Sequence, residues 1–386
     1  MNGLADFRRS LLLKINMNIR FSHVSNSSYT LHFFVNRTRG ISLLAFFLLS
    51  VLSLNAQPGY VDGRPVAHHR MACRDEGIVL RYGDGPDSCD TYGAREAVVN
   101  QEGDRYYLFY DGAGKDGWIA CLAESRDLRN WTKRGLVLEL GKPGSNDAKS
   151  ASSPWVIKEN DTWHMFYVGT PNATPPPYRI PAFPYLTMKA QSRSLAGPWK
   201  KQYDVVALPP KENSFYTVTS SPGFIVRQGN EYLQFFSGAT QEGKTIKRTL
   251  GIARTKDLNA SWKIDEKPIF PLDEQVENSS VFFDTKTKTW YLFTNHIGIN
   301  SKREEYTDAI WVYWTKDLNR WRSEDKAIVL DATNSIWAKG TIGMPTVIQV
   351  GNRLALLYDA AEGPSTSHMR RSIGLAWMEL PLKLSH

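Results

Sequence analysis

Two glutamates stand where strand-like runs of the sequence begin, in GAREAVV (93–99) and VENSSVF (276–282). Two carboxylates that face one cavity can act as a general acid and as a base or nucleophile, the pair that cleaves a glycosidic bond. We therefore expect Glu96 and Glu277 to be catalytic, with Asp147 as a third candidate from a nearby loop. The alternative is that each acid caps a strand or pairs with a neighbour, as Glu96 could with Arg95.

Other polar and aromatic residues fall in segments that could reach the same place. Acids could position sugar hydroxyls, arginine could pair with a charged group, and aromatic rings could stack on a sugar. His296 could hold a hydroxyl, donate a proton or hold an ion, and a purely structural role is an equal alternative. The candidate substrate-binding residues are Asp90, Arg95, Asp111, Trp155, His296, Asp308, Trp337 and Asp359.

The elements that must position these residues come from an internal repeat. Four segments share one ending, a short turn followed by tryptophan: SRDLRNW (125–131), SRSLAGPW (192–199), TKDLNASW (255–262) and TKDLNRW (315–321). Each follows two strand-like runs rich in aromatic and β-branched residues, with Gly, Asn or Asp turns between them. A fifth unit, with LALLY (354–358) and IGLAWMEL, lacks the closing motif.

Repeats of this length indicate a radial or stacked architecture. We predict an all-β fold, a five-bladed β-propeller with four antiparallel strands per blade, in preference to an open solenoid. The repeated tryptophan is expected in the core between blades. In a propeller, residues just before the first strand and just after the second meet at one mouth of the channel. The ends of the second strands, YDGAG, TNHIG and YDAAEG, would bring Asp111, His296 and Asp359 there.

One loop is too long for a hairpin: TPNATPPPYRIPAFPY (170–185). Its proline and aromatic content is too apolar for a solvated tail. Long loops of this kind more often wall a binding site or contact a partner.

The first 56 residues are predicted to be a leader, followed by one domain at 57–386. Residues 41–56 (ISLLAFFLLSVLSLNA) follow two arginines and end in small residues, a pattern typical of a cleaved signal peptide. A membrane anchor is the alternative, and Val35 is a candidate true start. We therefore expect a secreted or periplasmic protein with no membrane association after cleavage.

Charge and cysteines exclude some classes of function. The net charge is +8, but residues 1–56 carry six Lys or Arg and one acid, so the remainder carries only +3. That balance does not indicate a nucleic-acid partner. Cys73 and Cys89 could form a disulfide in an oxidising compartment, whereas Cys121 is expected to be buried. The cysteine spacing indicates no metal site.

The repeat pattern YYLFYDG…ESRDLRNW resembles five-bladed glycosidases, notably glycoside hydrolase families 43, 32 and 117, over residues 75–382. The resemblance implies action on glycans containing arabinose, xylose, fructose or anhydrogalactose. Family 43 enzymes place acids before the first strand of blades one, two and three. Here Glu96 takes the first position, but Ser152-Ser153-Pro154 and Ser220-Ser221-Pro222 take the other two.

Asp147 could therefore replace one missing acid, and Glu277 would supply another from blade four. Family 117 is similar in using a later-blade acid and a histidine, which supports Glu277 and His296. By analogy the mechanism would be inverting. The resemblance implies no cofactor, although some related propellers hold a divalent cation in the channel.

The resulting hypothesis is a secreted, exo-acting glycosidase of plant or algal oligosaccharides. A catalytically inactive carbohydrate-binding propeller is the alternative, since the two Ser-Ser-Pro segments lack acids. A phosphorylase would need more basic residues beside the acids. The oligomeric state is not set by the sequence.

Overall fold

The structure, a computed structural model, describes residue 60, residues 62–301 and residues 304–385. The predicted signal peptide, its cleavage site and the alternative start at position 35 lie outside these residues. The regular secondary structure of the described part is almost wholly β-strand, as the sequence predicts. Its two helical segments are single 3₁₀ turns, η1 (Pro86–Ser88) and η2 (Leu272–Glu274). No described helix is long and apolar enough to cross a membrane.

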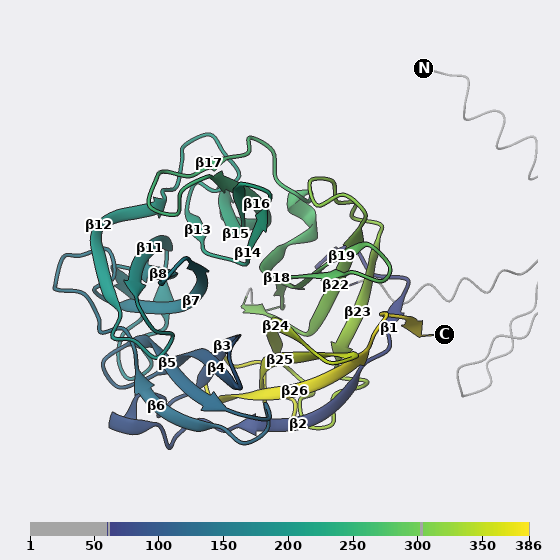
Figure 1. The fold of residues 1–386 in the computed structure, drawn as a ribbon, viewed down its shortest axis with the longest axis horizontal. Coiled ribbons are helices and arrows are strands. Elements are labelled where there is room, and N and C mark those ends of the chain that lie inside the picture. Colours follow the sequence, from purple (N-terminus) through teal and green to yellow (C-terminus); the bar gives the residue numbers. More distant parts are fainter. Residues whose placement is uncertain (1–59, 61, 302–303, 386) are drawn as a thin grey trace, which may run out of the picture. The chain divides into compact units, whose positions relative to one another are not determined.

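The strands pair antiparallel in chain order within successive groups (Figure 1). The first group is β3 (Ala94–Glu102), β4 (Arg105–Ala113), β5 (Trp118–Ser125) and β6 (Thr132–Leu136). The second is β7 (Ser150–Glu159), β8 (Thr162–Thr170), β11 (Leu186–Ser192) and β12 (Lys200–Leu208). The third is β13 (Thr219–Ser221), β14 (Ile225–Gln228), β15 (Glu231–Glu242), β16 (Thr245–Thr255) and β17 (Lys263–Ile264).

Two more groups follow, with short additional pairs. The fourth is β18 (Val276–Asp284), β19 (Thr289–His296), β22 (Ala309–Thr315) and β23 (Lys326–Asp331), extended by β1 (Arg70–Met71) and β27 (Leu384–Ser385). The fifth is β24 (Ile342–Val350), β25 (Arg353–Ala361), β26 (Arg371–Glu379) and β2 (Arg74–Leu80). Two hairpins project from loops: β9 (Asn172–Ala173) with β10 (Pro181–Ala182), and β20 (Gly298–Ile299) with β21 (Glu305–Tyr306).

The unit that lacks a closing motif is completed from the other end of the described chain. β2 pairs antiparallel with β26, so a segment near residue 75 forms the outer strand of the last group. In Figure 1 the groups lie around a common centre, with β3, β7, β18 and β24 inside and β2, β6, β12 and β23 outside. The first strands of the groups therefore meet at the centre, where the site must be sought.

Tight turns explain why the first two strands of most groups form hairpins. Four of these hairpins close with two-residue turns whose first residue has positive φ, the conformation that matches strand twist. These residues are Gly103, Asn160, Gly229 and Gly351.

The repeated tryptophans pack between neighbouring groups, which confirms their predicted core role. Trp199 contacts the Phe109 ring edge-on, with ring centroids 6.1 Å apart. Trp262 makes the same contact with Phe166 at 5.4 Å, and Trp321 with Phe235 at 6.2 Å. Each phenylalanine belongs to the preceding group: Phe109 lies in β4, Phe166 in β8 and Phe235 in β15. Each edge-on pair contributes about 0.5–1.5 kcal/mol beyond area burial.

The expected Cys73–Cys89 disulfide is wrong. All three cysteines are free thiols, and Cys73 and Cys89 pack in separate core clusters. Cys121 is fully buried, as predicted.

Candidate active site

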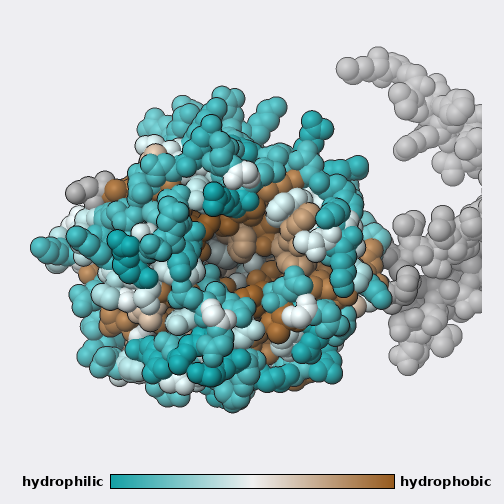
Figure 2. All heavy atoms as spheres, in the orientation of Figure 1, coloured by the Kyte–Doolittle hydropathy of each residue, from teal (hydrophilic) through white to brown (hydrophobic). Residues whose placement is uncertain are grey.

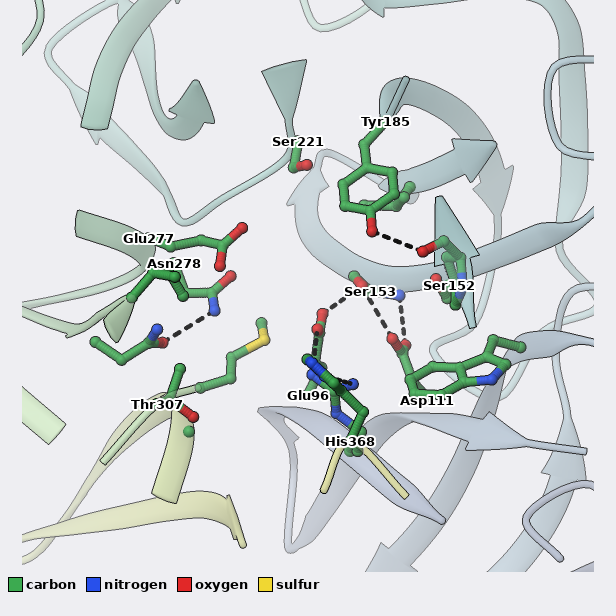
Figure 3. Close-up of a pocket in the computed structure, with 18 of the residues that line it drawn as sticks. Glu96, Asp111, Ser152, Ser153, Tyr185, Ser221, Glu277, Asn278, Thr307 and His368 are labelled. Atoms are coloured by element: carbon green, nitrogen blue, oxygen red, sulfur yellow. Dashed lines mark hydrogen bonds and ion pairs between the residues drawn. The ribbon is translucent and has the colours of Figure 1, made fainter. Parts of the chain in front are cut away.

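A pocket at the centre of the ring brings together the first strands of several groups. Figure 2 shows this centre as a hollow within a hydrophilic rim. Glu96, Asp111, Glu277 and Glu305 line the pocket, as do Arg95, Arg248, Arg371 and His368. Glu96 and Glu277, predicted as the catalytic pair, therefore face the same cavity (Figure 3).

A β-bulge at the start of each contributing strand shapes the pocket wall. The register with the second strand shifts just after Arg95 in β3, Ser152 in β7 and Glu277 in β18. The next residue in each strand has positive φ: Glu96 at 53°, Ser153 at 49° and Asn278 at 63°. Bulges re-aim side chains, and positive φ is costly for residues other than glycine.

The bulge also means that the two glutamates are not equivalent. Glu96 is itself a bulge residue, whereas Glu277 precedes its bulge and pairs with Asn295 across the hairpin. They nevertheless share their accessibility, since 21% of the Glu96 side chain and 23% of the Glu277 side chain are exposed. Both carboxyl groups can therefore be reached from the cavity.

Glu96 lies in a hydrogen-bonded cluster with Ser153 and Asp111. The Ser153 hydroxyl is 2.5 Å from Glu96 Oε2 and 3.0 Å from Asp111 Oδ2, and the Ser153 amide donates to Asp111 Oδ1 at 2.5 Å. Burial and the charge of Glu96 raise the pKa of Asp111 well above its usual range. One hydroxyl has one proton, so a protonated Asp111 can donate to Ser153 while Ser153 donates to Glu96.

A further hydrogen-bond donor lies on the other side of Glu96. Arg95 Nη2 lies 3.4 Å from Glu96 Oε1. Arg95 is held in place by Asp359, whose Oδ2 accepts from Arg95 Nε at 3.3 Å and from the Glu96 amide at 3.2 Å. Asp359 is fully buried and also pairs with Arg371. It therefore supports the pocket from beneath and does not line it.

Glu277 differs from Glu96 in the groups that surround it. Burial raises its pKa, the negative charges of Glu96 and Glu305 raise it further, and Arg248 opposes them. Arg248 Nε is 3.7 Å from Glu277 Oε1, while its two terminal nitrogens donate to Glu305 at 2.9 and 2.8 Å. Arg248 is thus hydrogen-bonded to Glu305 and lies beyond hydrogen-bond distance of Glu277, but its charge still opposes the rise in the pKa of Glu277.

His368 lines the pocket and was not found by the sequence analysis. It lies in the loop between β25 and β26, where Arg95 Nη1 is 3.3 Å from its Nδ1. Arginine can only donate, so Nδ1 accepts and the ring proton is on Nε2. Burial and the nearby arginines lower the pKa of His368 to about 3, which keeps the ring neutral. The sequence does not predict the path of the loop that carries His368, so nothing in the sequence placed this histidine at the pocket.

Asp147 and Asp90, by contrast, do not line the pocket. Both are fully buried. Asp147 Oδ2 accepts from Lys201 at 2.6 Å and from the Tyr167 hydroxyl at 2.9 Å. Asp90 Oδ2 is 2.5 Å from Lys133 Nζ and 3.4 Å from the Tyr110 hydroxyl. Each acid thus ties a loop to the second and fourth strands of its own group.

Three other candidates also lie away from the pocket lining. His296 is fully buried, stacks on Trp311 with ring centroids 4.0 Å apart and contacts the Tyr313 hydroxyl at 2.9 Å. Asp308 pairs with Arg64 at 3.5 Å. Trp337 donates from Nε1 to the Tyr358 hydroxyl at 2.7 Å.

Three predicted binding residues do line the pocket: Arg95, Asp111 and Trp155. The proline-rich loop 170–185 forms one wall through Ile180, Pro181 and Tyr185, as the sequence analysis expected for a loop of this kind. Among the described residues, no cluster of three or more His, Cys, Asp or Glu side chains is arranged to hold a metal ion.

The sequence matches no protein-family model and no curated protein. Solved structures are similar in fold at low identity. A complex of BT0996 with RGII aligns with a TM-score of 0.62 at 15% identity, over 81% of this protein and 93% of that one. The catalytic domain of a Coprinopsis cinerea GH62 α-L-arabinofuranosidase aligns with 0.56 at 13%, over 81% and 98%. A family 117 glycoside hydrolase of Zobellia galactanivorans aligns with 0.52 at 11%, over 80% and 91%.

The chain has the β-propeller-like fold of these glycoside hydrolases. Family 43 is also among the similar structures, so two of the three families named from the sequence recur here together with family 62. The low identities assign the chain to no single family. They leave its chemistry to be argued from the pocket.

Proposed function

We propose that this protein is a glycoside hydrolase in which Glu277 is the general acid and Glu96 is the general base. The observation that carries the proposal is that these two partly exposed glutamates line one pocket in different electrostatic surroundings. Two carboxyl groups with different surroundings are what acid and base roles require. The raised pKa of Glu277 suits a proton donor, and the donors around Glu96 suit a carboxylate.

In the proposed reaction, Glu277 gives its proton to the glycosidic oxygen as the bond to the anomeric carbon breaks. Glu96 takes a proton from a water molecule, whose oxygen attacks the anomeric carbon from the opposite face. The products are a free alcohol and a sugar of inverted configuration. The two acids come from different strand groups, β3 and β18, around one cavity, and an inverting pair needs a gap between its carboxyl groups that admits a water molecule.

We further propose a five-bladed propeller with four strands per blade. The five sequence units coincide with the five strand groups, each beginning at the centre of the ring. The wall formed by the loop 170–185 supports end-on entry of the substrate and therefore exo-action. The similar structures include an arabinofuranosidase and a complex with RGII, which supports plant or algal oligosaccharides as the substrate class.

Export to the periplasm or the medium remains a proposal from the sequence of residues 41–56. Expression of the full chain in a bacterial host and N-terminal sequencing of the product test it. A mature protein beginning near Gln57 in the periplasmic fraction is expected. An uncleaved cytoplasmic protein would contradict export.

The hydrolytic proposal is tested by a screen of the protein against arabinose-, xylose- and galactose-containing oligosaccharides. Glu96→Gln and Glu277→Gln are run beside Glu362→Gln, an exposed acid in the β25–β26 loop. Loss of a general acid or base lowers the rate about 10²–10⁴-fold. We expect that loss in the first two variants only, and proton NMR should show an inverted first product.

Sugar release that survives both substitutions would overturn the assignment of the acids. Binding without release by wild-type protein would instead favour the carbohydrate-binding alternative.

A further inference from the structure

The wall of the pocket beside Glu277 contains a pair of amides. Asn278 is the bulge residue of β18, and Asn295 lies in β19 opposite Glu277. Asn278 Nδ2 donates to Asn295 Oδ1 at 3.0 Å (Figure 3). The Asn278 backbone amide donates to Ser237 Oγ at 2.9 Å. Ser237 therefore holds Asn278, Asn278 in turn holds Asn295, and both asparagines line the cavity.

One atom of this pair is left without a partner. Asn295 is fully buried, and among the described residues its Nδ2 has no hydrogen-bond partner. Reversing the amide would exchange the two terminal atoms, but one polar atom would still be unpaired. A buried polar atom without a partner destabilises the folded protein, so a ligand group that pairs with it would remove that cost.

A second buried donor lies on the same side of the pocket. Arg248 is 4% exposed, and its Nε likewise has no hydrogen-bond partner within the described part of the chain. The nearest carboxylate oxygen, Glu277 Oε1, is 3.7 Å away, which is too far for a hydrogen bond. A hydroxyl can donate and accept, so it can satisfy Arg248 Nε and either end of the Asn295 amide.

The positive charges of the pocket are already engaged by protein carboxylates. Arg95 pairs with Glu96 and Asp359, Arg371 with Asp359, and Arg248 with Glu305. His368 is neutral because burial and the arginines lower its pKa. A uronate or sulfate would have to displace one of these carboxylates and would lie close to the others. A ring that offers only hydroxyl groups meets no such penalty.

We propose that the Asn278–Asn295 pair and Arg248 Nε form a recognition wall that selects an uncharged, hydroxyl-bearing sugar ring. The wall rests on the proposed function, because it defines which ring is presented to Glu96 and Glu277. Its two unpaired donors fix the orientation of that ring. The pocket thereby discriminates against sugars that carry a carboxylate or sulfate.

The test is a binding titration that does not depend on catalysis. Trp118 and Trp155 line the pocket, so intrinsic tryptophan fluorescence reports occupancy. L-arabinose, D-xylose and D-galactose are titrated into wild-type protein, with D-galacturonate as the charged comparison. Asn295→Ala and Asn295→Val remove the amide. The backbone tolerates valine at this position, since Val168 occupies the equivalent position of β8, opposite Ser152.

We expect at least one neutral sugar to bind more tightly than galacturonate. Both Asn295 variants should weaken that binding about three- to tenfold, the value of one neutral hydrogen bond. Asn352→Ala, in the exposed β24–β25 turn, should bind as wild type does.

Unchanged affinity in the two Asn295 variants would overturn the proposal, as would tighter binding of galacturonate or no response to any neutral sugar. Failure of the hydrolase proposal would look different. In that case neutral sugars would still bind in an Asn295-dependent way, but oligosaccharides would not be cleaved.

Discussion

Glu274 and Glu277 are three residues apart, yet they are in opposite physical situations. Glu274 has a side chain only 5% exposed and accepts from Lys326 at 2.6 Å and from the Tyr313 hydroxyl at 2.8 Å. Glu277 is 23% exposed, and its arginine neighbour is 3.7 Å away and bonded to another acid. Glu274 is buried and paired with a lysine and a tyrosine, whereas Glu277 faces the pocket and has no cation within hydrogen-bond distance.

Asp90 and Asp147 belong with Glu274 in this comparison. Each of the three is buried with a lysine and a tyrosine, whereas Glu96 belongs with Glu277 at the pocket. Residue type alone therefore does not separate the structural acids from the proposed catalytic ones. The two kinds of acid differ in whether the side chain is exposed to the cavity and in how closely a lysine or arginine pairs with it.

The largest expected effect would come from breaking a paired acid. Asp147→Asn leaves Lys201, whose side chain is 6% exposed, without a charged partner. Breaking such a buried pair costs about 3–5 kcal/mol, so the free energy of unfolding measured with urea should fall by that order. Hydrolysis per folded molecule should be unchanged.

Asp161→Asn, in the exposed β7–β8 turn, is the matched control for that measurement. A variant of Asp147 that keeps its stability and loses activity would contradict the structural role assigned here. It would restore Asp147 as the catalytic candidate that the sequence analysis named.

A smaller effect is expected from the Ser153 hydroxyl. Ser153→Gly keeps the positive φ of the bulge and removes the donor to Glu96. Hydrogen bonds to charged groups contribute about 1.5–3 kcal/mol, so kcat/KM should fall at least about tenfold. The melting temperature should fall only by the loss of the hydroxyl's hydrogen bonds and not through backbone strain, since glycine tolerates this backbone conformation.

Ser152→Ala is the control for Ser153, because Ser152 also lines the pocket but bonds to Ser150 at 2.8 Å. Equal losses of kcat/KM in Ser153→Gly and Ser152→Ala would show that the hydrogen bond from the Ser153 hydroxyl to Glu96 is not what activity depends on. That outcome would contradict a role of the Asp111–Ser153–Glu96 hydrogen bonds in activity.

The smallest effect concerns the pH dependence of stability. The pKa of Glu277 is raised on folding, so the folded protein holds this proton over a pH range in which the unfolded chain has lost it. Its contribution is favourable below the unfolded value of 4.5 and is lost as pH rises through the folded pKa. Glu277→Gln removes this dependence.

Melting temperatures of wild-type protein and Glu277→Gln, measured from pH 4 to pH 8, check the prediction. The variant should gain stability relative to wild type as pH rises. A constant difference across the range would contradict a raised pKa for Glu277.

Much of the fold could be predicted because it is repeated. The recurring tryptophans and the two-residue turns can be recognised from short stretches of sequence. They predict the strand groups, the core positions and the residue at which each first strand begins. Glu96 and Glu277 follow from those starts. The outer strand β2 could not be found this way, since a segment near residue 75 completes the group of β24 to β26.

The errors in the site have physical reasons. In TNHIG, alternation along the strand sends Asn295 to the pocket and His296 into the core. Asp111 in β4 and Asp359 in β25 occupy the position that Asn295 has in β19, opposite the residue just before the bulge of the first strand. An alignment of the repeats on this position could have identified Asn295. Asp90 and Asp147 were misleading because their lysine partners come from the fourth strands, which no local pattern links to them.

The most direct test of the account compares Glu277→Gln with Glu274→Gln. For both proteins kcat/KM on the best substrate of the screen and the melting temperature are measured under the same conditions. We predict that Glu277→Gln loses about 10²–10⁴-fold in activity and melts no lower than wild type. Glu274→Gln should melt at a lower temperature and retain activity while folded. The reverse pattern, or equal losses of activity, would contradict the claim that Glu277 is the catalytic acid of this pocket.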